Sequence, residues 1–269
     1  MAHLAFNKVC EVGDFEHPEL RDVISEIYPD YDVRGGGLNR KFWEVAMSVR
    51  ALRRFGAVHA DAAILGVGAG TEATSFFLSN YVRLVVATDL YQGAGEWAGF
   101  APSTMLNDPA RHAPCPFRAD HLIVQHMDGC NLQYPNNTFD GIYSSSSIEH
   151  FGSREAVREA SAEMARVLKP GGVLTLSTEY KVAGPRGNGW AIGNTIIMSM
   201  ADIQEMIVAA SGLAPVDEID TRLSDETMRQ TRDMESILNG DMSQGNSNIM
   251  IAHKGYIFCS IHLTLRKGM

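Results

Sequence analysis

The sequence predicts an α/β protein with a doubly wound, mostly parallel sheet and helices on both faces. Short apolar runs typical of buried strands alternate with amphipathic stretches typical of helices. A glycine turn, Gly68-Ala69-Gly70, joins the first apolar run to a helical stretch. No helix follows the long alternating run near the C-terminus, so we expect that run to join the sheet edge as an antiparallel strand.

The elements follow one another in a regular order. A first helix begins after Asn39, a candidate N-cap, and keeps apolar residues at helical spacing as far as Phe55. Another helix follows the glycine turn as far as Leu78, and a third has Ser153 as its N-cap. A fourth is expected over 200–210. Strands are predicted at 62–67, 84–90, 122–128, 139–145, 173–180, 213–220 and 255–267.

Composition limits the classes of function. The 269 residues carry a formal net charge of −9, which argues against a nucleic-acid partner because phosphate binding needs a basic surface. The four cysteines are scattered and indicate a reducing compartment. The N-terminus lacks the apolar stretch of a signal peptide, and no run of about 18 apolar residues predicts a membrane span. We therefore expect a cytoplasmic protein.

Several polar or glycine positions lie where strands end, at the edge where doubly wound sheets bind ligands. Gly68 and Gly70 let backbone amides at a helix N-terminus approach a ligand. Asp89 ends the second strand about twenty residues later, where a carboxylate can accept hydrogen bonds from ribose hydroxyls. These features alone fit either a nicotinamide or a sulfonium cofactor. Asp128 ends the third strand.

Five motifs in order resemble the class I S-adenosylmethionine-dependent methyltransferase superfamily, closest to its small-molecule group, which includes ubiquinone and sterol methyltransferases. They are GxG, the strand-end acid, D-x-x-x-L-x-x-P-x-x-x-F-D, S-x-x-E-H and LKPGG, within roughly residues 60–180. The resemblance implies a seven-stranded Rossmann-like sheet with an antiparallel last strand. It also implies a helical cap over 1–58 that covers substrate and cofactor, and a methyltransferase domain over 59–269 with insertions at 92–121 and 181–198. S-adenosylmethionine would be the cofactor and S-adenosylhomocysteine its product.

The resemblance also implies roles for individual residues. The glycine turn would lie beside the methionine portion of the cofactor, Asp89 on the ribose, and Asp128 on the adenine amino group. Two positions depart from the family, which usually has an acid at Gly66 and a glycine at Glu72; the Glu72 carboxylate could instead meet the cofactor's ammonium or only interact with the helix dipole. The expected cofactor-binding set is Gly66, Gly68, Gly70, Glu72, Asp89, Leu90, Asp128, Gly129, Cys130, Ser145 and Ser146.

Catalysis of methyl transfer can consist largely of positioning, because the reaction is an in-line displacement at carbon. A hydroxyl acceptor would also need a base, and His150 is the first candidate, unless it only caps or packs. Glu149 is the second candidate. It lies in EHFGSRE, which resembles the EHFGHE tract of mycolic acid cyclopropane synthases, where it would be among the groups that bind a bicarbonate base.

The acceptor is expected to be a small hydroxylated molecule, such as a sugar or a glycosylated metabolite, that is methylated on oxygen. Candidate contacts come from the two insertions and the end of the fifth strand, and we expect no required metal. Alternatives are carbon methylation or cyclopropanation, a nicotinamide-dependent oxidoreductase, and a non-catalytic cofactor-binding protein; a homo-oligomer is also open. The expected substrate-contacting residues are Trp97, His112, Tyr180, Arg186 and Trp190.

Overall fold

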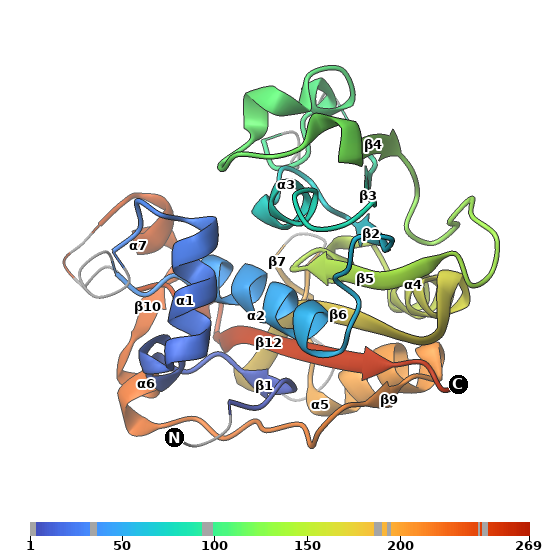
Figure 1. Ribbon diagram of the computed structural model, residues 1–269. Coiled ribbons are helices and arrows are strands. Elements are labelled where there is room, and N and C mark those ends of the chain that lie inside the picture. The colour runs from blue at the N-terminus through green and yellow to red at the C-terminus, as the bar shows by residue number, and fades with distance from the viewer. Residues whose placement is uncertain are drawn as a thin grey trace.

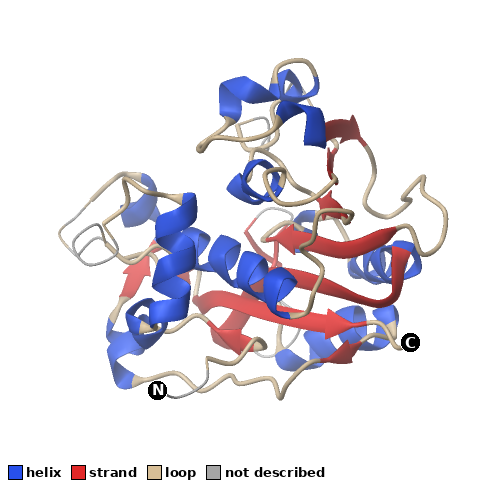
Figure 2. Ribbon diagram, in the orientation of Figure 1, coloured by secondary structure: helices blue, strands red, loops and turns tan. Residues whose placement is uncertain are grey.

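The computed structural model describes residues 4–32, 37–92, 99–185, 190–192 (backbone only), 195–241, 243 and 247–269. Figures 1 and 2 show the arrangement of its elements. The strands are β1 (Lys8–Val9), β2 (Ala63–Val67), β3 (Leu84–Asp89), β4 (Leu122–His126), β5 (Phe139–Ser145), β6 (Leu168–Ala183), β7 (Trp190–Ile192), β8 (Thr195–Ile196), β9 (Ala214–Pro215), β10 (Thr231–Asp233), β11 (Met250–His253) and β12 (Tyr256–Arg266).

The helices differ widely in length. The α-helices are α1 (Pro18–Ile27), α2 (Arg40–Arg54), α3 (Ala73–Leu78), α4 (Arg154–Val167), α5 (Met200–Ile203), α6 (Asp225–Arg229) and α7 (Met234–Leu238). Single turns of 3-10 helix are η1 (Val12–Glu16), η2 (Ser103–Leu106), η3 (Pro109–His112), η4 (Ala119–His121) and η5 (Ile148–His150), and η6 (Gln204–Ala209) is a π-helical turn.

Among the described residues, ten strands form one sheet, in the order β10-β11-β12-β6-β5-β2-β3-β4, with β1 and β9 also paired to β12. The strands β2 to β6 run parallel to one another, and β12 runs antiparallel to β6. All five residues of β2 are buried, as expected for a strand covered on both faces. The strand order reverses between β2 and β5, which places a ligand-binding crevice at their carboxyl ends.

The doubly wound sheet and its antiparallel last strand are confirmed, with differences at the edge. The sheet has ten strands rather than seven, and β12 is not the edge strand. Its outer side is covered by β11, β1 and β9, which pair with successive parts of this 11-residue strand. The strand expected at 213–220 is reduced to Ala214–Pro215, because the Asp217 carboxylate accepts the backbone N–H groups of Phe6 and Asn7 in place of regular pairing.

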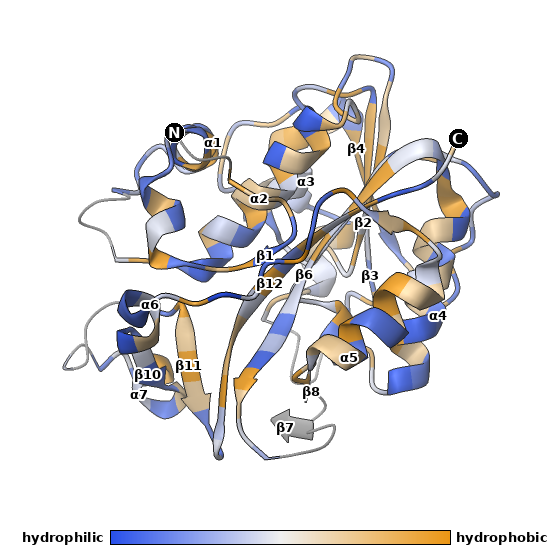
Figure 3. Ribbon diagram, turned by 90° about the horizontal axis from the view of Figure 1, so that it is seen from below, coloured by the Kyte–Doolittle hydropathy of each residue, from blue (hydrophilic) through white to orange (hydrophobic). Residues whose placement is uncertain are grey.

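Helices cover both faces of the sheet. Figure 3 shows α1, α2 and α3 on one side and α4 and α5 on the other. The expected caps are present: Asn39 accepts from the Lys41 N–H at 2.9 Å, and Ser153 from the Ala156 N–H at 3.0 Å. The helix expected over 200–210 is formed by α5 and the π turn η6. No helix in the described ranges is long and apolar enough to cross a bilayer.

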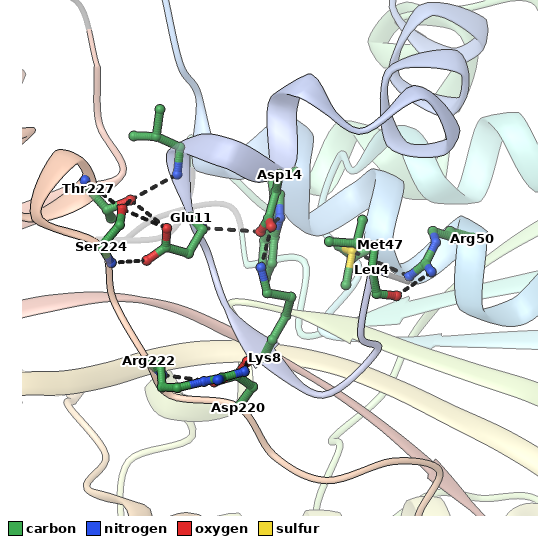
Figure 4. A network of polar contacts seen from close by, with 12 residues as sticks. Leu4, Lys8, Glu11, Asp14, Met47, Arg50, Asp220, Arg222, Ser224 and Thr227 are labelled. Carbon is green, nitrogen blue, oxygen red and sulfur yellow. Dashed lines mark hydrogen bonds and ion pairs between the residues drawn. The ribbon is translucent and has the colours of Figure 1, made fainter. Parts of the chain in front are cut away.

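The N-terminal segment is tied to the sheet through buried polar contacts as well as through β1 (Figure 4). The Lys8 ammonium pairs with the Asp14 carboxylate, which also accepts the indole N–H of Trp43 at 2.8 Å. All three residues are buried. The described parts of the first 58 residues, 4–32 and 37–58, therefore contribute a strand as well as helices, and this network fixes α2 against the sheet.

Removing the Asp14 carboxylate is predicted to destabilise the fold. Asp14→Ala leaves the buried Lys8 ammonium without its carboxylate, which costs about 3 kcal/mol in free energy of unfolding. The double variant Lys8→Met/Asp14→Leu removes both charges and should recover most of that loss. Urea unfolding measures both, and a single variant as stable as the wild type would contradict the prediction.

Candidate functional site

The glycine turn and the end of β3 are joined by hydrogen bonds. Gly68 and Gly70 have φ values of +62° and +48°, a backbone region that favours glycine. The Gly70 N–H donates to Asp89 Oδ2 at 3.0 Å, and the Leu90 N–H donates to Asp89 Oδ1 at 2.7 Å. The Asp89 carboxylate therefore holds the turn against the second strand, at the edge where the sequence predicts the cofactor.

The end of β4 lies next to the same turn. The Met127 N–H donates to the Asp89 carbonyl at 2.9 Å, which brings the loops after β3 and β4 together. Asp128 is exposed, and its Oδ1 accepts the Cys130 N–H at 2.9 Å. Asp89 and Asp128 thus lie at the ends of adjacent parallel strands. Asp128's adenine contact stays a prediction.

Three residues closely cover the glycine positions. A Cβ at Gly68 would overlap the Ser147 hydroxyl, one at Gly70 would lie 2.6 Å from the Phe100 carbonyl oxygen, and one at Gly129 would lie 2.7 Å from the Phe151 ring. The glycines and Asp89 supply the backbone and acceptor groups that an adenosine cofactor needs, so the residues present fit such a cofactor. A ligand above the turn must contact or displace Ser147 and Phe151, which the sequence interpretation did not include.

Gly66 lies under the turn against an aromatic ring. A Cβ there would lie 2.9 Å from Cε1 of Tyr143, a fully buried residue whose hydroxyl pairs with that of Ser75 on α3. Burial raises the pKa of Tyr143 well above its usual value, so the phenol is neutral. The tyrosine occupies the space that any side chain at position 66 would need, which explains the glycine.

Glu72 lies at the N-terminus of α3, half-buried, and accepts a hydrogen bond from the Thr74 hydroxyl at 3.3 Å. Burial raises its pKa to about 8, and the charge of Glu44 adds to this effect. Lys41 and the Ser145 hydroxyl partly offset it. The carboxyl group therefore faces charges from α2, and a cation bound beside it would favour its ionised form.

Helix α2 contributes charged groups that the sequence interpretation missed. Arg40 donates to Glu179 Oε1 at 2.6 Å and to the Ser260 hydroxyl at 2.9 Å. Glu44, fully buried, accepts from the Ser146 hydroxyl at 2.8 Å and from the Lys41 ammonium at 3.2 Å. Although burial opposes ionisation, Lys41 and Arg40 hold the pKa of Glu44 below its usual value. The available signal was the charged set Arg40-Lys41-x-x-Glu44 at the start of a helix whose middle turns are mostly apolar.

Burial shifts the pKa values of the two candidate catalytic residues in opposite directions. Glu149 is fully buried, and its Oε2 accepts from the Thr178 hydroxyl at 3.0 Å. Burial and the neighbouring Glu179 raise its pKa to about 8. His150 Nδ1 pairs with the Thr195 hydroxyl at 3.0 Å, and burial, with the cations Lys41 and Arg40, lowers its pKa to about 4. The imidazole is therefore neutral near pH 7.

Of the five residues expected to contact the acceptor, the structure describes the side chains of two. Tyr180 is half-buried on β6, and its backbone pairs with β12 and with Met198. His112 lies in the 92–121 insertion, with Nε2 2.8 Å from the Thr104 hydroxyl. Trp97, Arg186 and the Trp190 side chain lie outside the described residues. Within the described ranges, no group of three or more His, Cys, Asp or Glu side chains could hold a metal ion.

The buried Glu149 predicts a fall in stability with rising pH. A carboxyl group whose pKa is about 8 when folded and about 4.5 when unfolded favours the fold in its protonated form. Its contribution is complete below about pH 4.5 and is lost as the pH rises through about 8. The free energy of unfolding should decrease over that interval, and Glu149→Gln should make the decrease smaller in urea titrations; an unchanged pH profile would argue against the shifted pKa.

The packing at Gly66 predicts that an added methyl group destabilises the fold. Gly66→Ala brings a Cβ against the Tyr143 ring and should cost about 2 kcal/mol in free energy of unfolding. In a double-mutant cycle, Tyr143→Ala should make the same substitution nearly neutral. Equal costs in both backgrounds would show that the ring is not the obstacle.

Comparisons with known proteins agree with this geometry. Residues 65–176 match the family model described as a methyltransferase domain. The chain is similar to 27-O-demethylrifamycin SV methyltransferase of Amycolatopsis mediterranei, with 35% identity over 69 residues, 25% of this chain and 24% of that protein. It is also similar to demethylmenaquinone methyltransferase of Corynebacterium kroppenstedtii, with 34% identity over 113 residues, 42% of this chain and 40% of that protein.

The similarity to those two proteins therefore spans less than half of their lengths. A likeness in fold extends further: the crystal structure of the (4+2)-cyclase SpnF covers 97% of both chains with a TM-score of 0.55 and 16% identity. At that identity the likeness concerns the fold alone. Residues 65–176 are thus similar to a methyltransferase domain, and the parallel sheet and the glycine turn joined to a strand-end aspartate agree with the fold of class I S-adenosylmethionine-dependent methyltransferases.

Proposed function

We propose that the chain binds S-adenosylmethionine at the carboxyl ends of β2, β3 and β4 and methylates a small acceptor on oxygen. The observation that supports this most is the pair of hydrogen bonds by which Asp89 holds Gly70 and Leu90. The bound cofactor supplies a methyl group on a sulfonium, and transfer to the acceptor oxygen leaves a neutral thioether. Glu72 would face the cofactor's ammonium, since it lies at the same turn with a raised pKa.

A hydroxylated acceptor, such as a sugar or a glycosylated metabolite, fits the polar cluster between α2 and the strand ends. Arg40, Glu44 and Glu179 offer charged groups that can orient hydroxyls there. One similar protein is named for an O-demethylated substrate, 27-O-demethylrifamycin SV, and this favours an oxygen acceptor.

Glu149 is the better candidate for the base that takes the acceptor's proton. Its carboxyl group has a raised pKa of about 8, so its ionised form is a stronger base than an ordinary glutamate, and the ionised fraction grows as the pH rises from 7 toward 8. His150, with a pKa of about 4 and Nδ1 held by Thr195, would act instead as a neutral orienting group. When the hydroxyl oxygen attacks the methyl carbon, its proton would pass to Glu149.

Carbon methylation is a second candidate, supported by the likeness to demethylmenaquinone methyltransferase, which covers more of this chain than the first relative does. The two reactions are distinguished by the product. Methyl transfer to oxygen gives an ether whose carbon resonance lies far downfield of a methyl group on carbon, which NMR with a labelled methyl donor resolves.

Calorimetry with S-adenosylhomocysteine tests the proposed cofactor. The wild-type protein should bind it, and NAD should give no binding. Asp89→Ala should weaken S-adenosylhomocysteine binding about tenfold or more, because the glycine turn loses its acceptor and the ribose its carboxylate. Asp61→Ala, at an exposed residue just before β2, is the matched control and should bind normally. Tight NAD binding, or equal affinities of the two variants, would refute the assignment.

A further inference from the structure

Two buried glutamates in the site each have one anchored and one unpaired carboxyl oxygen. Glu179 Oε1 accepts from Arg40 at 2.6 Å, and Glu149 Oε2 accepts from Thr178 at 3.0 Å. The other oxygens, Glu179 Oε2 and Glu149 Oε1, are buried and receive no hydrogen bond from the described part of the chain; His150 Nε2 lies 3.9 Å from Glu149 Oε1, beyond hydrogen-bond distance. Buried polar atoms are almost always satisfied in folded proteins, so unpaired oxygens at a strand-end edge indicate a ligand.

Both carboxyl groups lie at the carboxyl edge of the sheet. Glu179 lies near the end of β6, and Glu149 lies in the turn η5 that follows β5. They act on each other electrostatically, because the charge of Glu179 raises the pKa of Glu149, and Arg40 is affected by both. The anchors Arg40 and Thr178 limit their rotation, so the unpaired oxygens have fixed positions.

The surrounding charges disfavour a cationic acceptor. Arg40 donates to Glu179 Oε1 at 2.6 Å, so the charge of this carboxylate is already paired with a cation. An ammonium group would bring a second cation beside this pair. Glu149, with a pKa of about 8, is largely protonated near pH 7 and can donate as well as accept. A hydroxyl can donate to the ionised form of Glu149 and accept from its protonated form, whereas an ammonium can only donate.

We propose that Glu149 and Glu179 form an acceptor subsite that binds two neighbouring hydroxyl groups of one neutral polyol. Glu179 orients one hydroxyl by accepting its hydrogen bond, and Glu149 contacts the hydroxyl that is methylated. This inference rests on the proposed methyl transfer and adds the substrate class: a neutral compound with adjacent hydroxyls, rather than an amine or a compound with a single hydroxyl.

Ligand-observed NMR in the presence of saturating S-adenosylhomocysteine tests the subsite. The probes are cyclohexane-1,2-diol, methyl α-glucopyranoside, cyclohexanol and 2-aminocyclohexanol. The diol and the glycoside should bind at least about tenfold more tightly than the other two, because only they supply two neutral hydroxyls. Preference for the amino alcohol, equal binding of all four, or no binding of the diol and glycoside would overturn the proposal.

Three variants locate the binding. Glu179→Gln and Glu149→Gln should each weaken diol binding about tenfold while S-adenosylhomocysteine affinity stays within about twofold. Glu226→Gln, at an exposed position on α6, should leave diol binding unchanged. Should Glu179→Gln fail to fold because Arg40 loses its partner, Glu149→Gln decides, since it is nearly isosteric and removes no cation's main partner. Unchanged diol affinity in Glu149→Gln would refute the subsite. A wild-type protein that does not bind S-adenosylhomocysteine would instead refute the proposed function itself.

Discussion

The hydrogen bond from the Gly70 amide to the Asp89 carboxylate is the interaction on which the site depends. It joins the turn after β2 to the end of β3, so two parallel strands present their loops as one surface. The turn can adopt this shape because Gly68 and Gly70 both have positive φ values, where a side chain would also collide with Ser147 or Phe100. The Ala69 N–H, which donates to the Thr88 carbonyl at 2.9 Å, also holds the turn to β3, and the bond from Gly70 fixes the carboxylate of Asp89 against it.

Helix α2 supplies the buried charged side chains of the other half of the site. It brings Arg40 and Glu44 into a buried space otherwise bordered by strand ends, and both are held by hydroxyls from β12 or from the segment after β5. Buried charges are costly unless they are paired. A shift of the helix that broke these contacts would leave charges unpaired, so the network favours one position of the helix against the sheet. Ser146, which contacts Glu44, has a positive φ of 44°, a strained conformation of the kind that gathers at functional sites.

Much of the fold was predictable because local patterns agree with the tertiary structure. The strands with continuous apolar runs, the caps at Asn39 and Ser153 and the antiparallel C-terminal strand each have a signal within a few residues. The cover on β12 was not predictable, since β1 and β9 are two residues long and depend on partners more than 40 residues away in sequence. Strands that short carry no periodicity.

The proposed cofactor side of the site could be predicted from spacing, but the proposed acceptor side could not. Asp89 was found because a strand-end acid about twenty residues after a glycine turn is itself a pattern. Arg40 contacts Glu179 across 139 positions of sequence, and no local rule predicts that contact. Likewise, nothing adjacent to Gly66 shows that Tyr143 fills the space beside it.

A crystal structure with S-adenosylhomocysteine bound would show whether the proposed cofactor contacts form. We expect the ribose hydroxyls within hydrogen-bond distance of Asp89, adenine beside Asp128 and the amino-acid portion along the turn at Gly68 and Gly70. A ligand bound elsewhere, with the Asp89 and Asp128 side chains facing away from it, would rule out this site.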